Sequence, residues 1–190
     1  MAGPRRAPNS GSPLPDGVTG GADPSARTPR GTAKDRALRL LGVRARSREE
    51  LRRRLVAAGF PPDDVEAAVQ DLQAVGLVDD ERFAVEFARD RATRRLEGDR
   101  LVRSSLLAKG LPTDLTDRTV AALGDQGARA ADLAARKARR MTGLDPAVAH
   151  RRLVGMLIRR GYAPDAARDA ARAALSAAQD PCDQGASAVD

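Results

Sequence analysis

The chain has 190 residues, of which 42% are hydrophobic and only 2% are aromatic. Its 33 Lys and Arg residues exceed its 26 Asp and Glu residues, and the resulting net charge of +7 attracts polyanions. A single cysteine, Cys182, excludes an internal disulfide bond, and no apolar stretch approaches the roughly 18 residues that a transmembrane helix needs. Because Arg5 and Arg6 are not followed by an apolar segment, a secretory signal is not predicted and we expect a cytoplasmic protein.

The N-terminal segment, residues 1–33, holds six of the twelve prolines and almost no large apolar side chain. Such a segment cannot bury enough surface to offset the entropy lost on ordering, so we predict a disordered Pro/Gly-rich tail. Residues 177–190 are predicted to form a second disordered tail for the same reason. The helical part is expected between these two tails.

The first predicted repeat covers residues 34–77. An opening helix is expected over Asp35–Val43, and Ser47 with Glu50 three residues later is typical of a capping box that starts the second helix. Gly59 is predicted to end that helix in a left-handed conformation. Pro62 can begin the third helix, since its missing amide hydrogen would be unpaired there anyway.

The second predicted repeat covers residues 78–125. The acidic run Asp79–Glu81 suits the positive end of a helix dipole, so its first helix is expected to start there, with Phe83 in the core. The second helix is predicted after Gly98, and the third follows Pro112.

The third predicted repeat covers residues 126–176. Its first helix is expected to include the basic stretch Arg136–Arg140, and Asp145 followed by Pro146 is expected to start the second. The last helix is predicted to follow Pro164.

A fixed spacing of 51 residues relates the three repeats. Gly59, Gly110 and Gly161 each follow apolar residues at the same offsets and are each followed by a large apolar side chain. Internal repetition at such a period indicates a modular array. The sequence therefore predicts an all-α protein of three tandem three-helix repeats that form an elongated, curved modular scaffold, with its function on a long surface.

Catalytic and metal-binding patterns are weak. His150 is the only histidine and has no second histidine or nearby cysteine to form a metal site or a catalytic pair. The glycines end helices rather than forming phosphate-binding loops. We therefore expect no enzyme activity, no cofactor and no metal.

Arginine clusters recur along the helices. They could be solvated helix faces with local carboxylate partners, or contacts to nucleic acid or an acidic protein surface. Because aromatic residues are scarce, any DNA contact is expected to be with the phosphate backbone and independent of sequence. The candidate partner or DNA contacts are Arg48, Arg52, Arg53, Arg89, Arg95, Arg100, Arg103, Arg136, Arg140, Arg152, Arg159 and Arg160.

The run from Arg46 to Arg91 resembles the RecX family of recombinase regulators. The resemblance includes Arg46–Leu55, Gly59-Phe60 and, most specifically, Gly76–Ala84. It extends more loosely over residues 35–175, through Lys109-Gly110 and Arg159–Tyr162. Leu101 and Val102 depart from it, because the family commonly has a more basic stretch there.

The resemblance implies three tandem three-helix repeats that bind the RecA recombinase filament on DNA and restrain its recombinase and coprotease activities. A long, basic scaffold fits a helical groove that also contains DNA phosphate. We expect a monomer that acts by differential binding, without covalent chemistry. The alternatives are a helix-turn-helix-type transcriptional regulator, which the acidic helix after Gly59 disfavours, and an adaptor for an unrelated protein.

Overall fold

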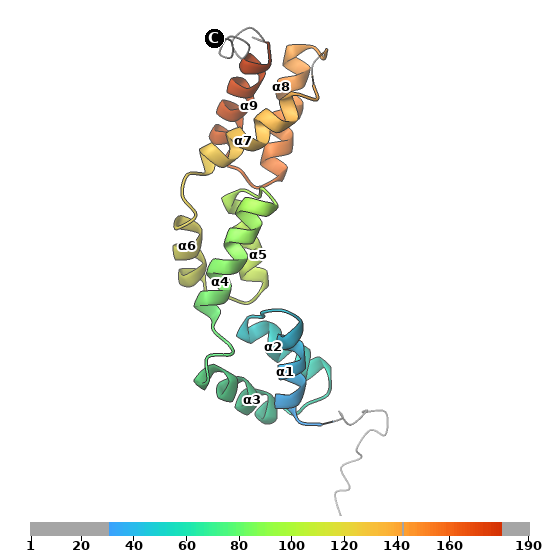
Figure 1. Ribbon diagram of the computed structural model, residues 1–190, viewed down its shortest axis with the longest axis vertical. Helices are drawn as coiled ribbons and strands as arrows, with labels where there is room; N and C mark the ends of the chain where they lie inside the picture. Colours follow the sequence, from blue (N-terminus) through green and yellow to red (C-terminus); the bar gives the residue numbers. More distant parts are fainter. Residues whose placement is uncertain (1–30, 142, 180–190) are drawn as a thin grey trace, which may run out of the picture.

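The computed structural model describes residues 31–141 and 143–179. In this part of the chain the structure contains nine α-helices and one π-helical turn, arranged as three successive groups of three helices (Figure 1). The groups follow one another along the long axis of the molecule, with the first at the lower end of the view and the third at the upper end. The predicted elongated, all-α repeat architecture is confirmed.

The helix bounds follow the sequence pattern closely. The first repeat contains α1 (Ala33–Val43), α2 (Arg48–Ala57) and α3 (Pro62–Ala74). The second contains α4 (Asp80–Arg89), the π-helical turn Asp90–Arg94, α5 (Asp99–Ala108) and α6 (Thr113–Ala121). The third contains α7 (Gln126–Ala138), α8 (Pro146–Arg159) and α9 (Pro164–Gln179).

Three boundaries differ slightly from the expected ones. Helix α7 ends at Ala138, so Arg139 and Arg140, the end of the basic stretch expected in this helix, lie in the turn after it. Helix α1 begins at Ala33, because Thr32 accepts a hydrogen bond from the Asp35 amide and forms a complete capping box with it. Helix α9 continues to Gln179, three residues beyond the expected limit at 176. Most of the two tails predicted to be disordered, together with Cys182, lies outside the described residues.

The capping box predicted at Ser47 is only half present. The Ser47 hydroxyl accepts a hydrogen bond from the Glu50 amide, as expected. The Glu50 carboxylate, however, does not return to the start of the helix, because it binds Arg44, Arg46 and Lys109 instead. Glu50, predicted to cap its own helix, therefore binds a residue of the next repeat instead.

The turn after each middle helix has the same construction in all three repeats. Gly59, Gly110 and Gly161 adopt φ values of 90°, 79° and 91°, which confirms the predicted left-handed ends. The large apolar residue after each glycine, Phe60, Leu111 and Tyr162, is buried. The turn thus fixes the third helix against the second within each repeat.

Each repeat has its own hydrophobic core. Leu51, Leu55 and Val69 are central in the first core, Val102 and Leu106 in the second, and Leu153 and Tyr162 in the third. In every pair of helices with extensive contact, both helices come from the same repeat. The repeats are therefore joined by narrow contacts, as in other arrays in which each unit touches only its neighbours.

Candidate nucleic-acid interface

The positive charge of the helical region is concentrated in one repeat. Residues 126–176 contain eleven Lys and Arg residues and four Asp residues, a net charge of +7. Residues 34–77 have nine cationic and seven acidic residues, a net charge of +2, and residues 78–125 have nine and ten, a net charge of −1. The field that attracts polyanions is therefore strongest at the third repeat.

The candidate arginines of the first repeat are paired with carboxylates. Arg52 forms a bidentate pair with Glu66, with both nitrogen–oxygen distances at 2.7 Å, and its hydrogen bond lowers the pKa of Glu66. Arg53 donates to Glu49 at 2.8 Å. Such pairs use the guanidinium geometry that would otherwise be available for phosphate.

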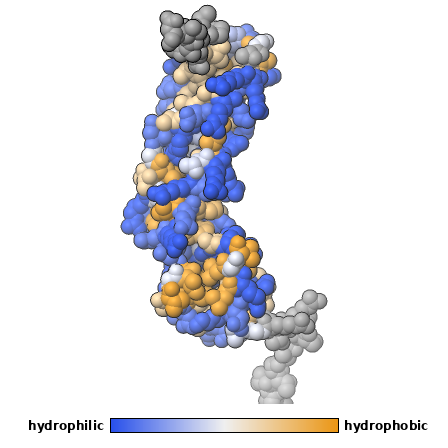
Figure 2. Space-filling model, viewed as in Figure 1, coloured by the Kyte–Doolittle hydropathy of each residue, from blue (hydrophilic) through white to orange (hydrophobic). Residues whose placement is uncertain are grey.

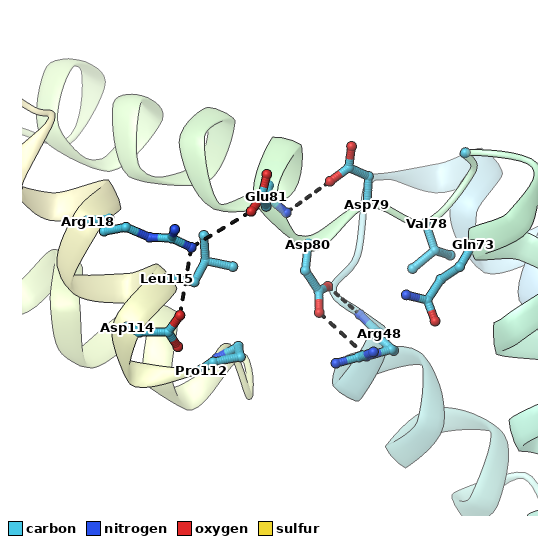
Figure 3. Close-up of a pocket in the computed structure, with 11 residues that line it drawn as sticks. Arg48, Gln73, Val78, Asp79, Asp80, Glu81, Pro112, Asp114, Leu115 and Arg118 are labelled. Carbon is cyan, nitrogen blue, oxygen red and sulfur yellow. Dashed lines mark hydrogen bonds and ion pairs between the residues drawn. The ribbon is translucent and has the colours of Figure 1, made fainter.

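A groove of about 420 Å³ between the first two repeats uses two further arginines (Figure 3). The Arg48 guanidinium lies 3.7 Å from the Asp80 carboxylate, which also accepts the Arg48 amide at 2.8 Å. Arg118 lies between Glu81 and Asp114, at 3.8 and 3.7 Å. Because carboxylates outnumber guanidinium groups around it, this groove does not attract phosphate.

Glu50 forms the charged centre of the junction between the first and second repeats. Arg46 donates to its carboxylate at 2.6 Å, and the Lys109 ammonium of the next repeat does so at 3.1 Å. Burial alone would raise the pKa of Glu50, but hydrogen bonds from Arg44 and Lys109, together with their charges, hold it at about 2. The Ser47 hydroxyl also donates to the Lys109 carbonyl at 2.6 Å, which anchors the same junction.

The candidate arginines of the second repeat are in mixed environments. Arg103 forms a bidentate pair with Asp117, at 2.7 and 3.3 Å. Arg95 lies 3.6 Å from Asp90, a carboxylate that it shares with Arg94. Arg89 and Arg100 are exposed and have no ion pair among the described residues.

The candidate arginines of the third repeat are exposed and have no carboxylate partner within the described ranges. They are Arg136, Arg140, Arg152, Arg159 and Arg160. Arg160 donates to a backbone carbonyl, that of Arg95, at 2.6 Å. The structure therefore divides the twelve candidates by repeat: those of the first are neutralised internally, and those of the third are not.

The second and third repeats meet through their backbones. The Gly98 amide donates to the Arg160 carbonyl at 2.8 Å, and the Arg100 amide donates to the Gly161 carbonyl at 3.1 Å. Gly98 and Arg160 lie 51 residues after Ser47 and Lys109, so the two junctions use equivalent positions. A hydroxyl makes the contact at the first junction, and a glycine amide makes it at the second.

Beside this second junction lies a hollow of about 560 Å³, named here the seam hollow. Its cationic lining residues are Arg94, Arg95, Arg136, Lys137, Arg140 and Arg160. Arg94 and Lys137 were not among the twelve candidates. Both belong to basic stretches that are visible in the sequence, but only the folded structure shows that two different repeats supply one lining. Glu97, the acidic residue of the lining, is bound by Arg91 at 2.7 and 2.8 Å.

The exposed hydrophobic residues lie mainly on the first repeat, away from the cationic third repeat. Hydrophobic residues gather over the first repeat in Figure 2, whereas hydrophilic residues dominate the face of the third. The exposed large apolar residues of the first repeat are Leu38, Val43, Val56, Val75 and Leu77. The two ends of the molecule therefore offer different chemistry to a partner.

Within residues 31–141 and 143–179, no three His, Cys, Asp or Glu side chains are grouped so that they could hold a metal ion. His150, in α8, is half-buried. None of the helices described in the structure is long and apolar enough to cross a membrane.

Comparison with known proteins identifies three family domains along the chain. They are the first three-helix domain of RecX at residues 33–72, the second at residues 79–119, and the third at residues 125–170. A protein of Mycobacterium avium (strain 104) named Regulatory protein RecX is 42% identical over 161 residues, covering 81% of this chain and 92% of its own. A protein of the same name from Mycolicibacterium smegmatis is 41% identical over 165 residues, covering 83% and 86%.

Solved structures show the same fold. The crystal structure of RecX from Lactobacillus salivarius superimposes with a TM-score of 0.67 at 18% identity, covering 75% of this chain and 94% of that one. A second crystal structure of a regulatory protein RecX has a TM-score of 0.63 at 22% identity, covering 70% and 67%. With three matched domains in the family's order and relatives above 40% identity over most of its length, the chain belongs to the RecX family of regulatory proteins.

Proposed function

We propose that the protein binds the RecA recombinase and its filament on DNA, and inhibits recombinase and coprotease activities without chemistry of its own. The observation that carries this proposal is membership of a family whose relatives are named regulatory proteins. An elongated array with separate cores, and with cations at one end that have no carboxylate partner among the described residues, supports it, because such a shape suits a long groove better than a small substrate. The protein would act in the cytoplasm, as a monomer.

Inhibition would follow from differential binding. A protein that binds a particular state of a filament favours that state by the difference in its affinities for the alternatives. Here the inhibited state would be a filament that no longer extends or that disassembles. Exposed arginines would add contacts with DNA phosphate that are independent of sequence and weakened by salt.

The test is to add the purified protein to RecA on single-stranded DNA and to follow ATP hydrolysis and strand exchange. We expect inhibition at substoichiometric or comparable concentrations. A Leu106→Asp variant serves as the negative control, because a charge in the second core disrupts the array. This variant should inhibit less than the unmodified protein. Absence of any effect at several-fold excess would contradict the proposal, and a footprint with sharp sequence preference would favour a transcriptional regulator instead.

We propose that RecA itself contacts the exposed apolar residues of the first repeat. Val75 and Leu77 are 67% and 55% exposed. We expect Val75→Ser combined with Leu77→Ser to weaken inhibition while leaving helicity unchanged, because neither residue is in a core. Leu144→Ser in the third repeat, where Leu144 is 38% exposed, is the matched control. Equal effects of the two changes would show that RecA does not bind this end.

A further inference from the structure

The seam hollow has an excess of positive charge that the described residues do not neutralise. Arg136, Lys137 and Arg140 have no ion pair among the described residues, and Arg160 is bound to a carbonyl oxygen. Arg94 and Arg95 share one carboxylate, Asp90, at the long distances of 3.5 and 3.6 Å. Six like charges around one hollow repel each other, which destabilises the arrangement unless an anion enters.

This charge is not a general result of an arginine-rich composition. The groove between the first and second repeats lies at the preceding junction and is lined by Asp79, Asp80, Glu81 and Asp114 (Figure 3). Its two guanidinium groups are both paired with those carboxylates. Neighbouring junctions of the same array thus have linings of opposite sign, and only the second suits an anionic ligand.

The backbone at the seam is also specialised. A π-helical turn over Asp90–Arg94 ends at Arg95, and Leu96 follows with a φ of 53°. Such turns and left-handed non-glycine residues are energetically unfavourable and are often found at functional sites. Here the third repeat holds the strained residue, because the buried Tyr162 hydroxyl donates to the Leu96 carbonyl at 3.2 Å. The strained segment supplies two of the six cations, Arg94 and Arg95.

The lining favours phosphodiester groups. Five of the six cationic residues are arginine, whose planar guanidinium binds phosphate oxygens in pairs. No aromatic residue lines the hollow, so bases would have no stacking surface and recognition would not depend on sequence. The hollow is large enough for several backbone groups of a strand that crosses it.

We propose that the seam hollow binds the phosphate backbone of nucleic acid, and that this binding locks the second and third repeats together. The six cations come from both sides of the junction: Arg94 and Arg95 from the second repeat, and the others from the third. A bound strand therefore contacts both repeats, and a ligand that binds only the docked arrangement stabilises it. The site refines the DNA contact of the proposed function, and so it depends on that function for its role in regulation.

The first experiment measures binding of a fluorescent oligo-dT strand by anisotropy at several salt concentrations, without any recombinase. Arg136→Ala combined with Arg140→Ala should lower affinity about tenfold or more and reduce the salt slope by about one to two. Arg139→Ala combined with Arg151→Ala removes the same charge from exposed positions of the same repeat that do not line the hollow. This control should lower affinity less than about threefold. Equal losses in the two variants would overturn the site.

The second experiment measures locking. Adding oligo-dT should raise the melting temperature of the unmodified protein, and this rise should disappear in the Arg136→Ala, Arg140→Ala variant. Poly-glutamate of matched charge should compete weakly. Tighter binding of poly-glutamate would show that the hollow receives an acidic protein surface instead. A rise produced equally by inorganic phosphate at the same phosphate concentration would show a simple anion site, which would also overturn the proposal.

The two proposals fail separately. If the unmodified protein does not inhibit RecA but the seam variant still loses oligo-dT binding, the seam site stands and the regulatory function does not. If the unmodified protein inhibits RecA but binds oligo-dT no better than the seam variant does, the regulatory function stands and the seam site is wrong.

Discussion

The close approach of two backbones at Gly98 gives a direct test of how the second and third repeats dock. A Cβ atom at Gly98 would lie 2.4 Å from the Gly161 carbonyl carbon and 2.4 Å from the Tyr162 amide nitrogen. Its φ of −79° is accessible to every residue type. Gly98→Ala would therefore introduce a steric clash across the junction without any strain in the local backbone.

The size of the destabilisation depends on how far the third repeat must shift to relieve the clash. Because both neighbouring atoms belong to the backbone, the third repeat has to shift by about 1 Å, and overpacking of this kind costs about 1–3 kcal/mol. The shift also stretches the Gly98–Arg160 and Arg100–Gly161 hydrogen bonds, each contributing about 0.5–1.5 kcal/mol. We expect Gly98→Ala to lower the free energy of unfolding by roughly 2–5 kcal/mol.

Urea unfolding followed by circular dichroism measures this difference. Gly42→Ala is the matched control, since a Cβ there meets nothing within 4 Å and alanine favours the helix that contains it. This control should be neutral or stabilised by up to about 1 kcal/mol. In Gly98→Ala the third repeat should also begin to unfold separately from the other two. If both variants are as stable as the unmodified protein, the two repeats do not dock through Gly98 in solution.

Three further changes test other contacts. Because the pKa of Glu50 is about 2, below its ordinary 4.5, its contribution is present above pH 4.5 and is lost as the pH falls toward 2. Glu50→Gln should lower the free energy of unfolding at neutral pH by on the order of 3 kcal/mol and reduce its dependence on pH between 2 and 4.5, measured by urea unfolding at several pH values. An unchanged pH dependence would show that the ion pairs of Glu50 do not form. Tyr162→Phe removes the hydrogen bond to Leu96 and should cost about 1 kcal/mol by the same assay, and no loss would show that the bond is not formed. Leu106→Asp places an unpaired charge in the second core and should cost several kcal/mol, seen as lost helicity; full helicity would mean that the repeat register is wrong.

The repeat architecture was readable from the sequence because its signals are local. Gly59, Gly110 and Gly161 recur at one spacing, and each needs a backbone conformation that glycine adopts at no steric cost. The residues after them are large and apolar and are buried in the structure. Helix ends and core positions depend on neighbours within one or two turns, so a pattern along the chain is enough to place them.

The role of Glu50 shows where this reasoning failed. Its position three residues after Ser47 indicated a capping box, yet its carboxylate binds Lys109, which lies 59 residues away in the chain. Local geometry allowed both arrangements, and the fold selected the one that neutralises several cations at the junction.

The number of repeats, most helix ends and the core positions can be read from the amino-acid sequence, because each depends on residues that are near in the chain. Which arginines are neutralised and which face solvent depends on how the helices pack together. Arg52 meets Glu66 and Arg103 meets Asp117 across helices of one repeat, whereas Arg136 and Arg160 meet no described carboxylate. Charge pairing depends on distances of a few ångströms between side chains from different helices, and those distances exist only once the chain has folded.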